Sequence, residues 1–199
     1  MSRRLGLLGG TFDPPHKGHL AAARAVRAAL GLDEVLLVVA GDPWQKTAAG
    51  AVSPAAVRLE MTRALVEGEP GLGVDPCEVE RPGPSYTVET LEARRTLEPG
   101  MDLFLIVGAD TLARIPTWNR WQDLCRLSTI VVVNRAPLVD SPVPAGLDPD
   151  RVVQVAMPPV DVSSSALRAT AARGGSIAEW TGESVARIVS RHGLYGARS

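Results

Sequence analysis

The residue types best suited to chemistry stand in the stretch LGLLGGTFDPPHKGHLAAA, residues 5–23, which holds two of the chain's three histidines. His16 and His19 lie three positions apart, after a short apolar run and at the start of a pattern with helical period. Imidazole N–H groups beside a helix N-terminus suit a polyphosphate, because the free N–H groups of the first turn favour an anion. Zinc binding and a packing or capping role are the alternatives, although neither H-E-x-x-H nor paired cysteines supply further zinc ligands. The pair therefore predicts phosphate contact.

Two adjacent glycines precede this histidine pair and one lies within it. The stretch matches neither the dinucleotide fingerprint G-x-G-x-x-G nor the phosphate loop G-x-x-x-x-G-K-[ST]. Gly9 and Gly10 nevertheless remove side chains where a ligand could approach the backbone, and Gly18 opens the following helix. We therefore expect an anion to bind between the end of the first strand and the start of the first helix.

A second set of phosphate-binding residue types stands in VDVSSSALR, residues 160–168. Ser163, Ser164 and Ser165 offer hydroxyl and backbone N–H groups at a predicted helix start, and Arg168 adds a planar guanidinium one turn later. A serine run in this position is also typical of an ordinary N-cap. The histidine motif on the same predicted sheet favours a second phosphate site.

The elements that must position these residues alternate between short apolar runs and segments of helical period. Runs such as LLVVA and LFLIV are apolar throughout, which is typical of parallel strands covered by helices on both faces. We therefore predict an α/β fold with a doubly wound, mostly parallel sheet, in one domain over residues 1–199, with ligands at the carboxyl ends of the strands. Strands are expected at 5–8, 35–40, 73–79, 103–107, 129–133 and 152–155. Helices are expected at 20–30 before Gly31, from the N-cap Ser53 to a stop at Gly68, and at 86–97, 164–173 and 183–192.

Composition and charge exclude several functions. The 199 residues are 45% hydrophobic and 22% charged, an ordinary globular composition. A formal net charge of -1 gives no bulk attraction to nucleic acid or to an anionic membrane, so we expect neither partner. Two cysteines cannot make a disulfide framework, and no stretch approaches the roughly 18 apolar residues of a membrane span. The sequence predicts a cytoplasmic protein and leaves its oligomeric state undecided.

Taken together, GGTFDPPHKGHL and VSSSALR resemble the paired H-x-G-H and S-S-T-x-x-R motifs of the nucleotidyltransferase superfamily, whose fold is Rossmann-like. Three further stretches resemble bacterial nicotinate-nucleotide adenylyltransferases in particular: GPSYTVETL at 83–91, VGADTLARIPTWNRW at 107–121, and the closing VARIVSRHGLYG. The similarity covers essentially the whole chain.

This resemblance implies an enzyme of NAD biosynthesis that joins ATP to nicotinate mononucleotide, forming deamido-NAD and pyrophosphate. It implies in-line attack of the substrate phosphate on the α-phosphorus without a covalent enzyme intermediate, so the protein supplies positioning and charge neutralisation. Mg²⁺ would travel on the ATP phosphates, with no dedicated protein metal site. The helical C-terminal part, about residues 163–196, would complete the ATP site.

The same motifs assign roles to individual residues. The expected catalytic residues are His16 and His19, which would hold the ATP phosphates, and Arg168, which would grip the leaving pyrophosphate. The residues expected to bind ATP are Gly9, Gly10, Thr11, Phe12, His16, His19, Gly108, Asp110, Ser164, Ser165 and Arg168. The residues expected to bind nicotinate mononucleotide are Asp13, Lys46, Tyr86, Thr87, Trp118 and Arg135.

Some of these positions have structural alternatives. Asp110 is equally suited to capping a helix, and Tyr86 and Thr87 to starting one. Trp118 is expected to stack on the pyridine ring, because it lies in a short polar region, although tryptophan is more often a core residue. Trp121 is expected to pack.

Two departures from the family pattern stand out. Where many members read P-P-H-[KR], this chain reads GDPWQKT at 41–47, so Lys46 alone keeps the cationic role. Ser165 replaces the usual threonine and retains its hydroxyl group. Rival functions are the sister pantetheine-phosphate adenylyltransferase, expected to lack PSYTVETL and the Trp118 segment, and a nucleotide-binding sensor without turnover.

Overall fold

Six strands form one sheet in the order β3-β2-β1-β4-β5-β6. The computed structural model describes residues 2–43, 52–135 and 141–196. The strands are β1 (Arg4–Gly10), β2 (Glu34–Val39), β3 (Leu72–Asp75), β4 (Asp102–Gly108), β5 (Thr129–Arg135) and β6 (Val152–Met157). β1 pairs in parallel with β4, β4 with β5, and β5 with β6. The strand order reverses between β1 and β4, as in dinucleotide-binding folds, so the predicted doubly wound parallel fold is confirmed.

Helices connect these strands. The α-helices are α1 (Lys17–Leu30), α3 (Ala55–Val66), α4 (Cys77–Glu80), α5 (Thr87–Leu97), α6 (Ala109–Leu112), α7 (Leu124–Leu127), α8 (Ser164–Ala172), α9 (Ala178–Thr181) and α10 (Glu183–Arg191). Short 3₁₀ turns are η1 (Ile115–Thr117), η2 (Trp121–Asp123), η3 (Pro149–Arg151) and η4 (Leu194–Gly196). Within the described ranges, no helix is both long and apolar enough to cross a membrane.

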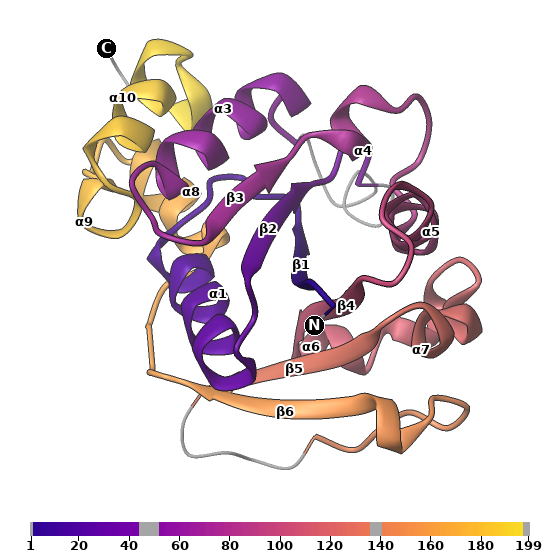
Figure 1. Cartoon of the computed structure of the whole chain (residues 1–199). Helices are drawn as coiled ribbons and strands as arrows, with labels where there is room; N and C mark the ends of the chain where they lie inside the picture. The colour runs from indigo at the N-terminus through magenta and orange to yellow at the C-terminus, as the bar shows by residue number, and fades with distance from the viewer. Residues whose placement is uncertain (1, 44–51, 136–140, 197–199) are drawn as a thin grey trace. The chain divides into compact units, whose positions relative to one another are not determined.

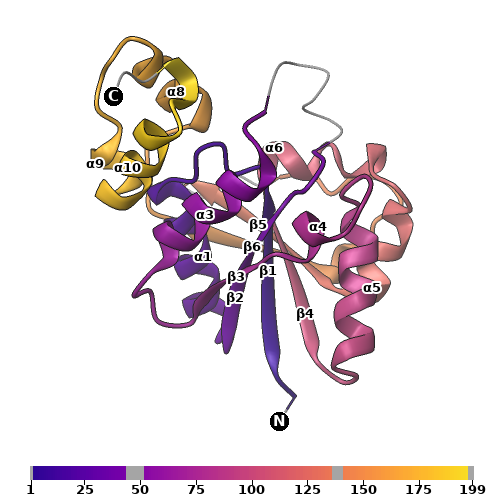
Figure 2. The same cartoon turned by 90° about the horizontal axis from the view of Figure 1, so that it is seen from above.

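The chain folds into two compact units, each assembled from three separate stretches. The first unit comprises residues 1–9, 22–36 and 86–159, and the second comprises residues 10–21, 37–85 and 160–199. In the first unit, α1 and α5 lie on opposite sides of β1 and β4 (Figure 2), and α7 packs against α5 and β5. In the second unit, α10 packs against α3 and α9, and η4 packs against α8 (Figure 1).

The apolar patterns place most elements where the sequence predicts them. In α1 the stripe of Leu20, Ala23 and Val26 is buried, and the helix ends before Gly31, whose φ of +58° is the left-handed conformation of a helix stop. The helices predicted at 86–97, 164–173 and 183–192 are α5, α8 and α10, each within one residue of the expected bounds.

Two local predictions are wrong. The strand expected at 73–79 ends at Asp75, because Pro76 has no N–H for a sheet and α4 begins at Cys77, whose N–H donates to the Asp75 carboxylate (3.0 Å). Ser53 does not cap α3: Pro54 is the N-cap, and it makes no side-chain capping bond. The backbone of Ser53 bonds to two side chains instead, as described below.

Candidate functional site

The loop after β1 is shaped by the packing of Phe12. This residue has a φ of +51°, a left-handed conformation that non-glycine residues seldom adopt, and it is 2% exposed. Its ring lies over Gly10, where an added Cβ would come within 2.8 Å of the ring. The ring also meets that of His19 edge to face, at 4.9 Å between centroids. Phe12 therefore acts on this loop through packing.

The two predicted catalytic histidines stack on one another, with ring centroids 3.8 Å apart and ring planes at 26°. The backbone N–H of His16 donates to Nδ1 of His19 (3.1 Å), so a neutral His19 ring carries its proton on Nε2. Burial lowers the pKa of His16 to about 4, so this ring is neutral at pH 7. Within the described part of the chain, His16 Nδ1 is buried without a hydrogen-bond partner, which is rare for a buried polar atom unless a ligand or water satisfies it.

Gly18 makes room for the His16 ring at the start of α1. A Cβ at Gly18 would lie 3.0 Å from both Cε1 and Nδ1 of His16 and 3.2 Å from Val162. A larger residue at this position would push the ring out of place. Packing against the His16 ring thus favours glycine at position 18, in addition to its predicted place at the start of the helix.

Helix α8 brings the serine motif to this loop. Ser163 is the N-cap, accepting a hydrogen bond from the Ala166 N–H (3.2 Å), so the capping alternative holds for that serine. Ser164 Oγ donates to the Pro14 carbonyl (2.9 Å), and Arg168 Nη1 donates to the Asp13 carbonyl (2.7 Å). Two motifs about 150 residues apart in sequence therefore meet within the second unit.

Arg58, which the sequence reasoning missed, fastens the same loop from α3. Its side chain is 1% exposed and donates to three backbone carbonyls: those of Ser53 (2.8 Å), Thr11 (2.8 Å) and Gly41 (3.1 Å). Desolvation lowers its pKa, and the Asp13 carboxylate opposes that effect. The only sequence signal is a charged residue beside the apolar stripe of α3, and such a residue usually faces solvent.

Asp13 completes this buried network. It is 5% exposed, and its Oδ1 accepts a hydrogen bond from the hydroxyl of Tyr195 while Oδ2 accepts one from the Ser53 N–H (3.2 Å). Asp13 was expected to bind nicotinate mononucleotide, but both of its carboxylate oxygens have partners inside the protein. Tyr195 is a second residue that the sequence reasoning did not single out.

Two further predicted ATP-binding residues are glycines of the first unit. Gly9 near the end of β1 and Gly108 at the end of β4 are both exposed, and an added Cβ at either would meet no atom within 4 Å. Both therefore border open space at the carboxyl ends of adjacent parallel strands, where such sheets bind ligands. Asp110 is exposed in the first turn of α6, whose N-cap, Gly108, has no side-chain capping bond, so Asp110 does not cap this helix.

The residues predicted to hold the nicotinate ring also lie in the first unit. Tyr86 is the N-cap of α5 and Thr87 its first residue, so both do start a helix, and both are partly exposed. Trp118 follows η1, is partly exposed, and donates its backbone N–H to Ile115 (2.8 Å). Trp121 packs on Gly146, as expected.

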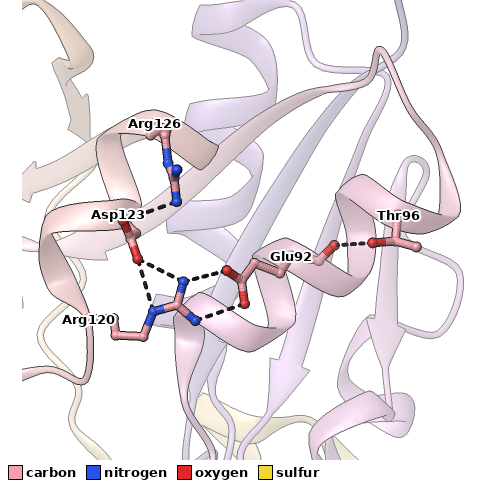
Figure 3. Close-up of polar contacts among 5 residues, drawn as sticks. All are labelled: Glu92, Thr96, Arg120, Asp123 and Arg126. Carbon is pink, nitrogen blue, oxygen red and sulfur yellow. Dashed lines mark hydrogen bonds and ion pairs between the residues drawn. The ribbon is translucent and has the colours of Figure 1, made fainter.

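Figure 3 shows how the segment after Trp118 is tied to α5. Arg120 has a φ of +47° and donates to both carboxylate oxygens of Glu92 in α5, at 2.6 and 3.1 Å. It also donates to Asp123 (3.0 Å), which in turn accepts from Arg126 (3.1 Å). Because the pair is bidentate and belongs to a network, it holds this segment more firmly than an isolated surface ion pair would.

The last two predicted residues, Lys46 and Arg135, and the alternative of a zinc site remain. Lys46 lies outside the described residues, and Arg135 is the last residue of β5. Among residues 2–43, 52–135 and 141–196, no group of three or more His, Cys, Asp or Glu side chains is placed to hold a metal ion, so the stacked histidines have no third zinc ligand there.

Comparison with known proteins shows which family this chain resembles. A family model described as cytidylyltransferase-like matches residues 7–170. Proteins named "probable nicotinate-nucleotide adenylyltransferase" are similar over nearly the full length. The one from Albidiferax ferrireducens is 39% identical over 97% of this chain and 98% of its own, and one from Thermus thermophilus is 41% identical over 96% and 99%. A solved structure of nicotinic acid mononucleotide adenylyltransferase from Plasmodium falciparum, complexed with NaAD, has the same fold: its TM-score is 0.78 at 14% identity, and the match covers 98% of each chain.

Proposed function

The chain belongs to the cytidylyltransferase-like family and, within it, to the nicotinate-nucleotide adenylyltransferases of NAD biosynthesis, and from that premise we propose that it joins ATP to nicotinate mononucleotide. The products are deamido-NAD and pyrophosphate. The observation that carries the proposal is the meeting of α8 with the histidine loop, through Arg168 on Asp13 and Ser164 on Pro14. The complex of the Plasmodium protein with NaAD, the same dinucleotide, supports it.

The reaction is an in-line displacement at the α-phosphorus of ATP. An oxygen of the nicotinate mononucleotide phosphate forms the new P–O bond, and the bond to the β-phosphate oxygen breaks, so pyrophosphate leaves with the electron pair. Such a reaction needs positioned charge and hydrogen-bond donors more than a nucleophilic side chain. Mg²⁺ would be carried by the ATP phosphates, since it prefers phosphate oxygens and water over an all-protein cage.

The histidines and the helix start supply donors for the transferred phosphate. His19, with Nδ1 engaged by the His16 N–H, presents Nε2–H as its donor. His16 is neutral, so it contributes no charge, and its buried Nδ1 has no hydrogen-bond partner within the described residues. The first N–H groups of α1 favour the same negative charge.

Helix α8 supplies the cation. Arg168 donates one N–H to the Asp13 carbonyl and one to Ser165 Oγ (3.3 Å), and these two bonds fix the plane of its guanidinium. Its other N–H groups bind the pyrophosphate oxygens. The C-terminal part, about residues 163–196, thereby completes the ATP site. Gly9 and Gly108 of the first unit remain predicted ATP-binding residues.

Nicotinate recognition is assigned to the first unit. Trp118 stacks on the pyridine ring, and Tyr86 and Thr87 line the pocket at the start of α5. Lys46 and Arg135 remain predicted contacts of the substrate phosphate.

The decisive experiment measures pyrophosphate release from MgATP with three acceptors in parallel: nicotinate mononucleotide, its amide counterpart and phosphopantetheine. We expect the highest kcat/KM with nicotinate mononucleotide, and deamido-NAD as the product by mass. A preference for phosphopantetheine would assign the sister activity. ATP binding without turnover of any acceptor would make the protein a nucleotide sensor.

A further inference from the structure

The C-terminal 3₁₀ turn η4 reaches the buried base of the histidine loop. Its central residue, Tyr195, has a φ of +59°, a conformation that costs free energy for a side chain of this size. The Tyr195 hydroxyl donates to Asp13 Oδ1, and η4 packs against α8, with Gly196 close to Ala172. The turn η4 therefore contacts both elements of the phosphate site: the histidine loop through Tyr195, and α8.

The side chain and the backbone carbonyl of Asp13 are hydrogen-bonded to different groups. Its carboxylate takes hydrogen bonds from Tyr195 and from the Ser53 N–H, while its carbonyl accepts from Arg168 Nη1 (2.7 Å). A shift of the Asp13 side chain therefore moves the carbonyl that sets the direction of the Arg168 guanidinium. Misplacement of a catalytic group by about 1 Å costs up to a hundredfold in rate.

Arg58 compensates the buried Asp13 charge and fixes the surrounding backbone. Its three carbonyl bonds join the loop after β1, the loop after β2 and the start of α3. A buried carboxylate is tolerated only where charge and hydrogen bonds satisfy it, and Arg58, Ser53 and Tyr195 do so together. Burial and the hydrogen bond to Asp13 raise the pKa of Tyr195, which keeps its hydroxyl protonated as a donor.

From this arrangement we infer that Tyr195 and Arg58 are positioning residues, which fix Asp13 and, through its carbonyl, aim Arg168 at the pyrophosphate end of ATP. The inference deepens the proposed function and rests on it for the identity of the reaction. It assigns the C-terminal turn a role in binding the leaving group, although Tyr195 itself does not touch a substrate.

The test compares Tyr195→Phe with Thr181→Val. Each removes one hydroxyl group from the second unit; that of Thr181 is buried and donates only to backbone carbonyls of its own helix end, at 3.0 and 3.2 Å. In Tyr195→Phe we expect the Kd for pyrophosphate, by titration calorimetry, and the KM for pyrophosphate in the reverse reaction to rise roughly tenfold or more, the range for one charge-assisted hydrogen bond that a misdirected Arg168 would no longer make to pyrophosphate. The KM for nicotinate mononucleotide should stay within twofold. Thr181→Val should change thermal stability alone.

Arg58→Lys is the second variant, since it keeps the charge but loses the planar fork that reaches three carbonyls. It should give the same rise in pyrophosphate Kd, with its fold checked by circular dichroism. The inference is overturned if Tyr195→Phe lowers the melting temperature as Thr181→Val does while pyrophosphate Kd stays at the wild-type value. Because Kd is measured without turnover, a wild type that forms no deamido-NAD would defeat the proposed function and still leave this comparison decisive.

Discussion

The buried His16 predicts a pH dependence of stability that can be separated from that of every other group. Burial lowers the pKa of His16 from 6.5 to about 4 in the folded protein, because the charged ring cannot be hydrated there. In the unfolded chain the same ring keeps the ordinary value. Between these two pH values the unfolded state therefore binds a proton that the folded state does not. The contribution of His16 to stability is complete above about pH 6.5 and is lost as the pH falls toward about 4.

The magnitude follows from the width of that window. A pKa lowered from 6.5 to about 4 corresponds to about 3 kcal/mol of unfolding free energy, most of it lost between about pH 6.5 and pH 4. Since domains of this kind have about 5–15 kcal/mol in total, the effect is large enough to measure. Over the neutral range the ring stays uncharged, so catalysis should not lose a His16 charge as the pH rises through 6.5.

The assay is urea unfolding of wild type and His16→Gln at about pH 7, 5.5 and 4.5, analysed by linear extrapolation. Other carboxylates and histidines titrate in both proteins, so only the difference between the two curves belongs to His16. We expect that difference to move by about 2 to 2.5 kcal/mol in favour of His16→Gln between about pH 7 and pH 4.5. Parallel curves, or a His16 ring that titrates near its ordinary pKa by NMR, would show that this ring is not desolvated and would refute the reasoning.

Three substitutions test the proposed site directly. His19→Ala should lower kcat about a hundredfold or more with a smaller change in ATP affinity, because a preorganised donor acts on charge that develops in the transition state; steady-state kinetics with near-normal turnover would remove the catalytic role. Arg168→Lys keeps the charge but loses the planar fork, so forward turnover and the affinity for pyrophosphate in the reverse reaction should both fall, and unchanged values in both directions would make it an ordinary surface arginine. Trp118→Ala should lower kcat/KM for the acid and the amide mononucleotides together while the preference for the acid survives, because both present the same ring face and differ in unpaired donors worth roughly 1–3 kcal/mol each. Equal wild-type efficiencies for the two would contradict the deamido assignment.

The sheet and most helices follow from local patterns in the sequence. The continuous apolar runs of β2 and β4 predict buried parallel strands, and Gly31 predicts the end of α1 through its backbone freedom. The pairing of the two phosphate motifs is also predictable, because strand ends in such folds share one edge of the sheet. These features depend on short-range periodicity and on general rules of topology.

The buried network beneath the histidine loop could not be predicted in that way. Along α3 the apolar Val57 is only partly buried, while its charged neighbour Arg58 is 1% exposed. The face of a helix that turns inward depends on what it meets, and here it meets carbonyl groups of loops that no pattern identifies. The hydrogen bond between Asp13 and Tyr195 could not be predicted for the same reason, since the two residues are 182 positions apart.

That separation has a consequence for the timing of biosynthesis. Ribosomes add about 5–20 residues per second, so Tyr195 emerges roughly 10–40 s after Asp13. Arg58, only 45 positions after Asp13 and bonded to the neighbouring Thr11 carbonyl, is available much earlier to neutralise the carboxylate while the nascent chain grows. The loop can thus form a first, charge-balanced version without its tyrosine, and under the inference above the Arg168 guanidinium would be aligned only after translation has passed η4.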